Sequence, residues 1–122
     1  EKVDDFPWPD PEKYIDPEKC REAVKAVPEG YAIMGIAWSS HFQDACAAFG
    51  METALIKMMM EPEMFKAVLD RITDFYLKAN EIFYKATEGL IHAVLIGNDF
   101  GSQNNLMVSP DMLREFVLDG TQ

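Results

Sequence analysis

The sequence predicts an α/β fold in which about two parallel strands are joined by crossover helices. Two apolar runs of strand length, Tyr31–Ala37 and Ile91–Gly97, are separated by a long segment with helical periodicity. Parallel neighbouring strands require such a crossover, which is usually helical and covers the sheet. The order strand, helices, strand, loop, helix is therefore typical of a parallel α/β protein.

Residues 1–15 are expected to form an extended arm, because three prolines alternate along "FPWPDP" and exclude regular pairing. Phe6, Trp8 and Tyr14 would fill apolar pockets from this arm. From residue 16 the pattern becomes helical, with Asp16 as the N-cap and Pro17 at the first helical position.

Tyr31–Ala37 follows this short amphipathic helix after Pro28 and Gly30, and Ile91–Gly97 follows Gly89. Both runs are almost uninterrupted by polar residues and are bounded by turn residues. This predicts two strands that are buried on both faces. His92 would then be a core histidine rather than a ligand.

Between the two runs the sequence predicts three helices, over "SSHFQDACAAF", over "METALIKMMM", and from Pro62 to Gly89. The last has a continuous apolar stripe at helical spacing, formed by Phe65, Val68, Leu69, Ile72, Phe75, Tyr76, Ala79, Ile82, Phe83 and Ala86. After the second run, Ser109 and Pro110 predict the cap and first residue of a final helix.

The composition excludes several classes of function. The net charge of -10 provides no basic surface for phosphates, so nucleic acid is an unexpected partner. No apolar run approaches the roughly 20 residues that cross a bilayer, and the N-terminus is acidic, which predicts a soluble cytoplasmic protein without a membrane partner. Cys20 and Cys46 are expected to be reduced.

Two parallel strands alone would leave open edges and uncovered apolar faces. We therefore expect the chain either to be a fragment of a larger barrel or open sheet, or to complete its sheet by self-association. In either case the strand edges would be covered.

Four blocks of the sequence resemble the middle portion of the uroporphyrinogen decarboxylase superfamily in order and spacing. They are "DDFPWPD", "GIAWSS", "FGMETALIKMMMEPEMFKAVLDRITDFY" and "GNDFGSQNNLMVSPDMLREFV". This superfamily includes the decarboxylase and the related corrinoid and coenzyme M methyltransferases. The resemblance implies that residues 1–122 are one segment of a partial (β/α)8 TIM barrel, about a third of an enzyme, and inactive in isolation.

In such barrels the loops that follow the strands form the catalytic face. The loops "AWSSHFQ" and "NDFGSQNN" both follow strands, so we expect them to lie side by side. Asp99 is the candidate catalytic residue, and the candidate substrate-binding residues are Trp38, Ser39, His41, Gln43, Asn98, Gln103 and Asn104. For Asn98 and Asn105 a local turn role is equally open, and Trp38 is favoured as a packing residue.

The resemblance distinguishes two branches. Gln43 falls where the decarboxylase has a substrate-holding tyrosine, and Asn98 falls where it usually has serine. Arg21, Arg71 and Arg114 lie on predicted helices rather than in the loops, although carboxylate recognition favours arginine. The parent is therefore expected to be methyltransferase-like or uncharacterised, with the decarboxylase and a non-catalytic binding or assembly module as alternatives.

The methyltransferase branch uses zinc, which its members bind through a His-x-Cys pair and a later Cys. That pair would follow "SPDMLREFV" by one strand, after the last residue of this chain. We expect no metal or cofactor within the segment itself, whereas the parent would use zinc and a small-molecule or corrinoid substrate carried by a corrinoid protein.

Overall fold

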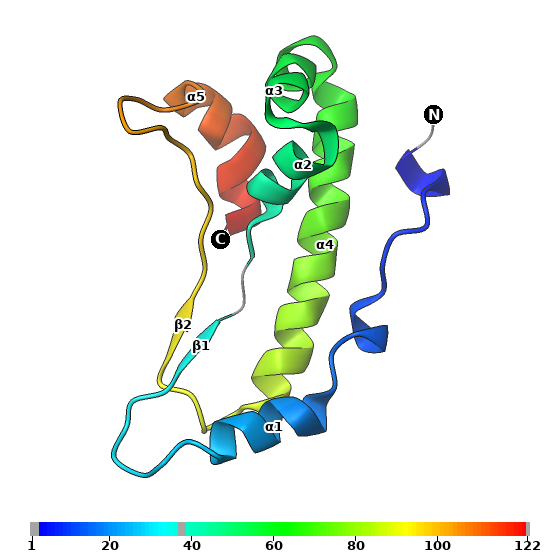
Figure 1. The fold of residues 1–122 in the computed structure, drawn as a ribbon. Helices are drawn as coiled ribbons and strands as arrows, with labels where there is room; N and C mark the ends of the chain where they lie inside the picture. Colours follow the sequence, from blue (N-terminus) through cyan, green and yellow to red (C-terminus); the bar gives the residue numbers. More distant parts are fainter. Residues whose placement is uncertain (1–2, 37–38, 122) are drawn as a thin grey trace. The chain divides into compact units, whose positions relative to one another are not determined.

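The computed structural model describes residues 3–36 and 39–121, and shows a mixed α/β chain that divides into two compact units. The first unit draws on Glu1–Trp8, Ser39–Asp74 and Gly97–Gln122, and the second on Pro9–Trp38 and Phe75–Ile96. Helix α4 (Pro62–Ala86) contributes its N-terminal half to the first unit and its C-terminal half to the second (Figure 1).

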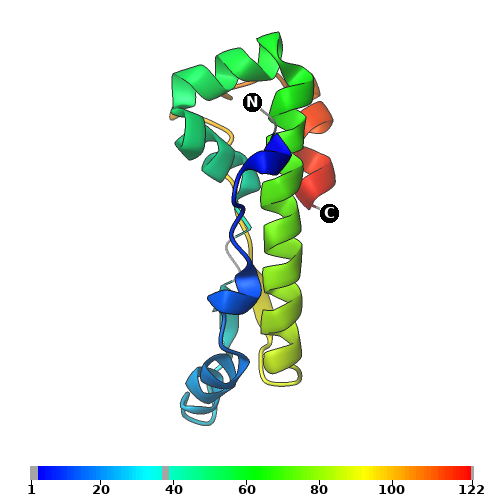
Figure 2. The same cartoon turned by 90° about the vertical axis from the view of Figure 1, so that its right-hand side faces the viewer.

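The first unit is helical. It contains α2 (His41–Phe49), α3 (Met51–Met60), the N-terminal half of α4, and α5 (Pro110–Leu113). Helix α5 continues as a π-helical turn over Arg114–Leu118 and a 3-10 turn over Asp119–Thr121. In Figure 2, α2 and α3 lie beside the N-terminal half of α4, together with the C-terminal helical segment.

The hydrophobic core of the first unit lies among these helices. Its members are Phe42, Ala45, Cys46, Ala54, Met58, Phe65, Leu69, Val108, Leu113 and Val117. The predicted breaks between the helices are confirmed, because Gly50 has a φ of 79° between α2 and α3, and Pro62 begins α4. Ser109 Oγ accepts the Met112 N–H at 3.2 Å, which confirms the predicted cap of α5.

The second unit contains α1 (Pro17–Lys25), the C-terminal half of α4, and the strands β1 (Met34–Ile36) and β2 (Ala93–Leu95). Asp16 caps α1 by accepting the N–H groups of Glu18 and Lys19, as predicted. Arg21 Nε donates to the Ala86 carbonyl at 2.9 Å and so satisfies an acceptor at the C-terminus of α4.

The two strands pair in parallel, with Met34 opposite Ala93 and Ile36 opposite Leu95. The parallel pairing is as predicted, but the prediction that both runs are buried on both faces is wrong. Each strand has three residues, and Met34 and Ile36 are 59% and 62% exposed, while only Gly35 between them is buried. Alternate residues point to opposite faces, so α4 covers the Gly35 face and leaves the other uncovered. Ala37 lies outside the described residues.

His92 is exposed, so the prediction of a core histidine is also wrong. The backbone N–H of His92 donates to the Ile33 carbonyl at 2.9 Å, and its Nδ1 accepts the Ile33 N–H at 3.1 Å. The histidine therefore extends the strand pairing by one residue. Its side chain lies just before β2 and is exposed among the described residues.

The N-terminal arm is less extended than predicted, because Val3–Asp5 and Pro11–Lys13 form 3-10 turns. Tyr14 is exposed and fills no pocket, contrary to expectation. Lys78 holds the second turn through ion pairs with Asp10 and Glu12 at 3.2 and 3.1 Å. Hydrogen bonding to Lys78 lowers the pKa of Asp10 below its usual value.

Gly35→Ala is expected to lower the free energy of unfolding by about 1–2 kcal/mol, because overpacking forces neighbours to move. A Cβ at Gly35 would lie 2.9 Å from two ring atoms of Phe83. Gly97→Ala is the matched control, since nothing lies within 4 Å of its Cβ position. Urea denaturation measures both, and equal midpoints for the two variants would contradict the packing described.

Candidate functional site

The loops that follow the two strands are joined by Asn98. Its Oδ1 accepts the Phe42 N–H at 3.1 Å, and its Nδ2 donates to the Ser39 carbonyl at 3.3 Å. Ser40 occupies the N-cap position of α2 but makes no side-chain capping bond. Asn98 therefore caps α2 from a distant part of the chain and holds the two loops side by side, as the sequence predicts.

Gln43 and Asp99 form a second link between the same loops. Gln43 Nε2 donates to Asp99 Oδ2 at 2.8 Å, and the pair lies at the surface. A carboxylate has two oxygens with two acceptor positions each, so Asp99 keeps acceptor capacity after this bond. The pair can accept a hydrogen bond from a ligand, with Gln43 fixing the direction of the carboxylate.

The polar run after Asp99 builds a tight turn. Ser102 Oγ donates to the Asn105 carbonyl at 3.1 Å and accepts the Asn104 and Asn105 N–H groups at 3.3 Å. An isolated antiparallel bridge between Gly101 and Leu106 closes the base of the turn. Gln103 therefore lies at an exposed tip next to Asn104, whereas Asn105 Oδ1 accepts the neighbouring Leu106 N–H.

Of the other predicted site residues, His41 lies away from these loops. His41 is buried, and its Nε2 lies 3.0 Å from the Val117 carbonyl in the core of the first unit. Ser39 is half-buried and contributes its carbonyl to the Asn98 contact. Trp38 lies outside the described residues. The loops thus bring together Ser39, Gln43, Asn98 and Asp99, but His41 does not reach the surface beside them.

The candidate site carries negative charge and no positive charge on its own loops. Residues 39–43 and 97–107 contain no lysine or arginine, and Asp99 is the charged residue among them. All three arginines lie on helical segments as predicted, where they contact Ala86, Asp4 and Asp111. Neutral and anionic acceptors favour a ligand that donates hydrogen bonds over one that presents several carboxylates.

The described residues contain no group of three His, Cys, Asp or Glu side chains placed as metal ligands. His41 Nε2 is engaged by a carbonyl and His92 Nδ1 by a backbone N–H. In the described part of the chain, no helix has the length and apolarity required to cross a membrane.

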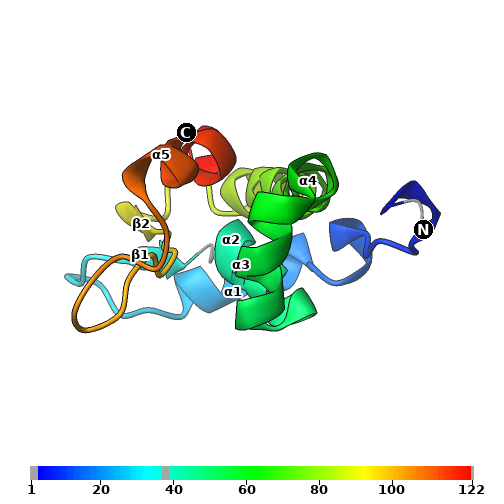
Figure 3. The same cartoon turned by 90° about the horizontal axis from the view of Figure 1, so that it is seen from above.

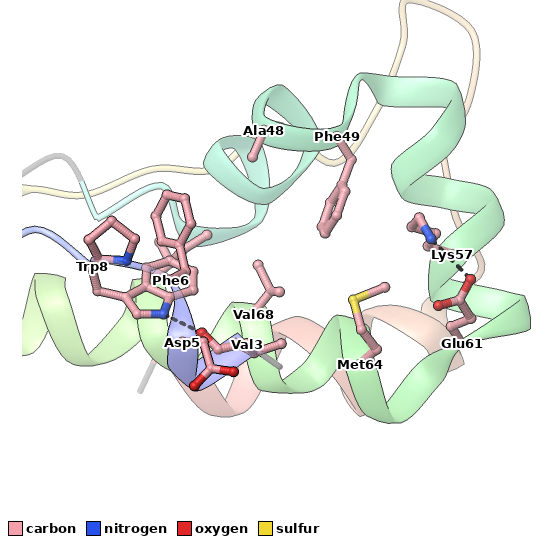
Figure 4. A pocket seen from close by; sticks show the side chains of 12 residues that line it. Val3, Asp5, Phe6, Trp8, Ala48, Phe49, Lys57, Glu61, Met64 and Val68 are labelled. Atoms are coloured by element: carbon pink, nitrogen blue, oxygen red, sulfur yellow. Dashed lines mark hydrogen bonds and ion pairs between the residues drawn. The ribbon is translucent and has the colours of Figure 1, made fainter. Parts of the chain in front are cut away.

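A separate groove of about 720 Å³ lies in the first unit and is lined mainly by apolar side chains (Figure 4). Phe49 and Val68 point into it from opposite sides, while the Lys57–Glu61 ion pair lies at one end. Phe6 and Trp8 stand at the other end, with ring centroids 5.0 Å apart. Phe6 and Trp8 were predicted to fill apolar pockets, but no feature of the sequence predicted the groove that they border.

Cys46 is expected to react with iodoacetamide far more slowly than Cys20 in the folded chain. Burial raises the pKa of the Cys46 thiol above its ordinary value of 9.0, so the reactive thiolate is disfavoured. Mass spectrometry after timed alkylation measures the labelling of each cysteine, and equal labelling of both would contradict the described core.

The raised pKa of Cys46 also affects stability. The folded chain retains a proton that the unfolded chain releases, so the free energy of unfolding should fall as the pH rises above about 9.

Comparisons of this chain with protein-family models, with curated proteins and with solved structures find no match.

Proposed function

We propose that this chain is a segment of a (β/α)8-barrel enzyme of the uroporphyrinogen decarboxylase superfamily, from its methyltransferase-like or uncharacterised branch. Its two strand-end loops contribute to the substrate-binding edge of the barrel. The observation that carries this proposal is the linkage of the two loops by Asn98 and by the Gln43–Asp99 pair. A connector without a ligand-binding role does not need this density of polar links between loops.

The strand pair supports the barrel part of the proposal. Parallel strands with α4 on one face leave Met34, Ile36 and Leu95 exposed on the other. In a closed barrel that second face is the interior, which is filled by layers of apolar side chains. The remaining strands would pair with the outer edges of β1 and β2 and cover this face.

Asp99 is the proposed catalytic residue, because it can accept a proton or a hydrogen bond from a ligand at the surface. Gln43 is a positioning residue that directs the Asp99 carboxylate through the 2.8 Å hydrogen bond. Asn98 fixes the two loops relative to each other. The exposed Gln103 and Asn104 amides would contact the remainder of the substrate.

The substrate class follows from the charge of the loops. A methylated corrinoid presents amide groups that match amide and carboxylate side chains, and a corrinoid protein would deliver it. Uroporphyrinogen presents many carboxylates, for which residues 39–43 and 97–107 offer no cation. The decarboxylase reaction is therefore the second candidate, and it requires arginines supplied from outside this segment.

A non-catalytic binding or assembly module is the third candidate. The outer edges of β1 and β2 would equally serve such a module, because an open strand edge can pair with another chain. The two readings differ in whether the strand-end loops bind a ligand. A module that uses only its strand edges has no need of the Gln43–Asp99 pair.

Asp99→Asn is expected to lower methyl transfer from methylcobalamin to a thiol about 100-fold or more, because Asp99 is proposed to accept the proton that the thiol loses when its sulfur takes the methyl group and the cobalt keeps the electron pair. Because the proposed enzyme is a whole barrel, the assay uses this chain within the proposed parent protein. Asp111→Asn is the matched control, since Asp111 is a highly exposed aspartate of the same unit and pairs only with nearby Arg114 in the described contacts.

Unchanged methyl transfer by Asp99→Asn would remove Asp99 from the catalytic role. Turnover of uroporphyrinogen in place of methylcobalamin would assign the decarboxylase branch. The absence of both binding and turnover, for either compound, would favour the assembly module.

A further inference from the structure

Three consecutive residues of the second strand-end loop contact the first turn of α2. Asn98 Oδ1 accepts the Phe42 N–H at 3.1 Å, and Asp99 Oδ2 accepts a hydrogen bond from Gln43 Nε2 at 2.8 Å. The ring centroid of Phe100 lies 5.9 Å from that of Phe42, and the two ring planes are tilted by 50°. Helix α2 therefore holds Asp99 together with the residue on either side of it.

Phe100 connects this loop to the hydrophobic core. Phe42 is fully buried in the core of the first unit, and the half-buried Phe100 packs against that core. The Phe100 carbonyl also accepts the Met107 N–H at 2.9 Å, which connects its backbone to the far side of the polar turn. Figure 3 shows α2 next to α3 and α4, the helices with which it shares this core.

The hydrogen bond between Gln43 and Asp99 depends on a fixed backbone. It joins two side chains at the surface, where water competes for both groups and one fixed geometry costs conformational entropy. When the backbone is held on both sides of Asp99, Gln43 has only the rotation of the Asp99 side chain left to fix. The Asn98 hydrogen bond holds one side, and the Phe100 ring holds the other.

We propose that Phe100 is a positioning residue, whose ring on Phe42 keeps the Asp99 carboxylate within hydrogen-bonding reach of Gln43. Its effect on catalysis rests on the proposed function of Asp99, whereas the positioning itself is measurable without turnover. A carboxylate that is already directed loses little further freedom when a ligand binds. An aromatic contact in the core thereby contributes to the site at the surface.

The first test measures how fast the Gln43 Nε2 protons exchange with water, by NMR of the isotope-labelled chain. A hydrogen-bonded group is protected from exchange, and Asp99→Ala gives the rate without this bond. Phe100→Ala should lose the protection seen in the unsubstituted chain and exchange as fast as Asp99→Ala. Phe100→Tyr keeps the ring and should keep the protection.

Circular dichroism checks that each variant keeps its helices. If Phe100→Ala loses its helical signal, Phe100→Leu takes its place with the same expectation, because leucine keeps an apolar side chain against the core but has no ring. Unchanged protection of the Gln43 amide in the folded variant would overturn the proposal.

Phe116→Ala is the matched control for a general effect on the core. Phe116 is also a half-buried aromatic residue of this core, but its ring lies 6.1 Å from that of Phe65 on α4. Its substitution should lower the free energy of unfolding while leaving the protection of the Gln43 amide unchanged. An equal loss of protection in Phe116→Ala and Phe100→Ala would overturn the proposal, because loosening of the core would then account for both.

Methyl transfer by the proposed parent protein separates this inference from the proposed function. Phe100→Ala should lower kcat about tenfold with little change in KM, because a misplaced group affects the transition state more than substrate binding. If the Gln43 protection is lost but neither Phe100→Ala nor Asp99→Asn changes kcat, the positioning is supported and the proposed function is wrong. If Asp99→Asn lowers kcat while Phe100→Ala changes neither kcat nor the protection, the positioning is wrong and the proposed function is retained.

Discussion

Phe65→Ala is expected to lower the free energy of unfolding by about 3–5 kcal/mol, the usual cost of truncating a buried aromatic residue. Phe65 is fully buried, and its ring centroid lies 6.1 Å from those of Phe49 and Phe116. The substitution therefore removes contacts from α2, α4 and the C-terminal helical segment at once. Urea denaturation followed by far-UV circular dichroism measures the change.

Phe6→Ala is the matched control for this prediction. Phe6 is 59% exposed at the end of the groove, so its truncation should cost less than about 1 kcal/mol. If Phe65→Ala were as mild as Phe6→Ala, then α2, α4 and the C-terminal segment would not share the core described.

Asn98→Ala is expected to lower the free energy of unfolding by about 1–3 kcal/mol, because it leaves partly buried backbone groups without partners. It removes the acceptor for the Phe42 N–H and the donor to the Ser39 carbonyl. Asn98→Asp should recover part of this loss, since a carboxylate still accepts at a helix N-terminus but cannot donate. Thermal or urea unfolding of the unsubstituted chain, Asn98→Asp and Asn98→Ala should give free energies of unfolding that decrease in this order.

Asn105→Ala separates this linkage from ordinary turn chemistry. Among the described residues, Asn105 Oδ1 accepts the adjacent Leu106 N–H at 2.8 Å, and Asn105 is exposed. Its substitution should cost less than that of Asn98. Equal costs would mean that the bonds across the two loops contribute no more than a local turn does.

The helices were predictable because their signals are local. Asp16 and Ser109 lie at the caps that their residue types favour, and Pro17, Pro62 and Pro110 begin helices. Helix α4 ends at Ala86, before Gly89, whose φ of 72° suits glycine. Each of these features depends on a few neighbouring residues, which a single sequence displays directly.

The extent and burial of the strands were not predictable in this way. An apolar run shows that its residues are suited to burial, but whether they are buried depends on which other elements cover the strand. Met34 and Ile36 are exposed because α4 covers only the Gly35 face. His92 is exposed because it lies next to β2, whose residues are also exposed.

The candidate site was predictable in position but not in detail. The strand-end rule placed Gln43 and Asp99 near each other, and they share a hydrogen bond. That Asn98 caps α2 could not be anticipated, because it lies more than 50 residues from Phe42 in the sequence. His41 is buried because it contacts Val117, which belongs to a distant segment of the chain. Its residue type and its place in the loop had instead suggested a substrate-binding role.

The most direct test of the central claim is to map methylcobalamin binding by NMR. Because the strand-end loops are proposed to hold the ligand, the resonances of Gln43, Asp99, Gln103 and Asn104 should shift during the titration, and Asp99→Asn should weaken the response. Shifts confined to Trp8, Phe49 and Met64 would place the ligand in the apolar groove. That result would contradict the assignment of the strand-end loops as the binding site.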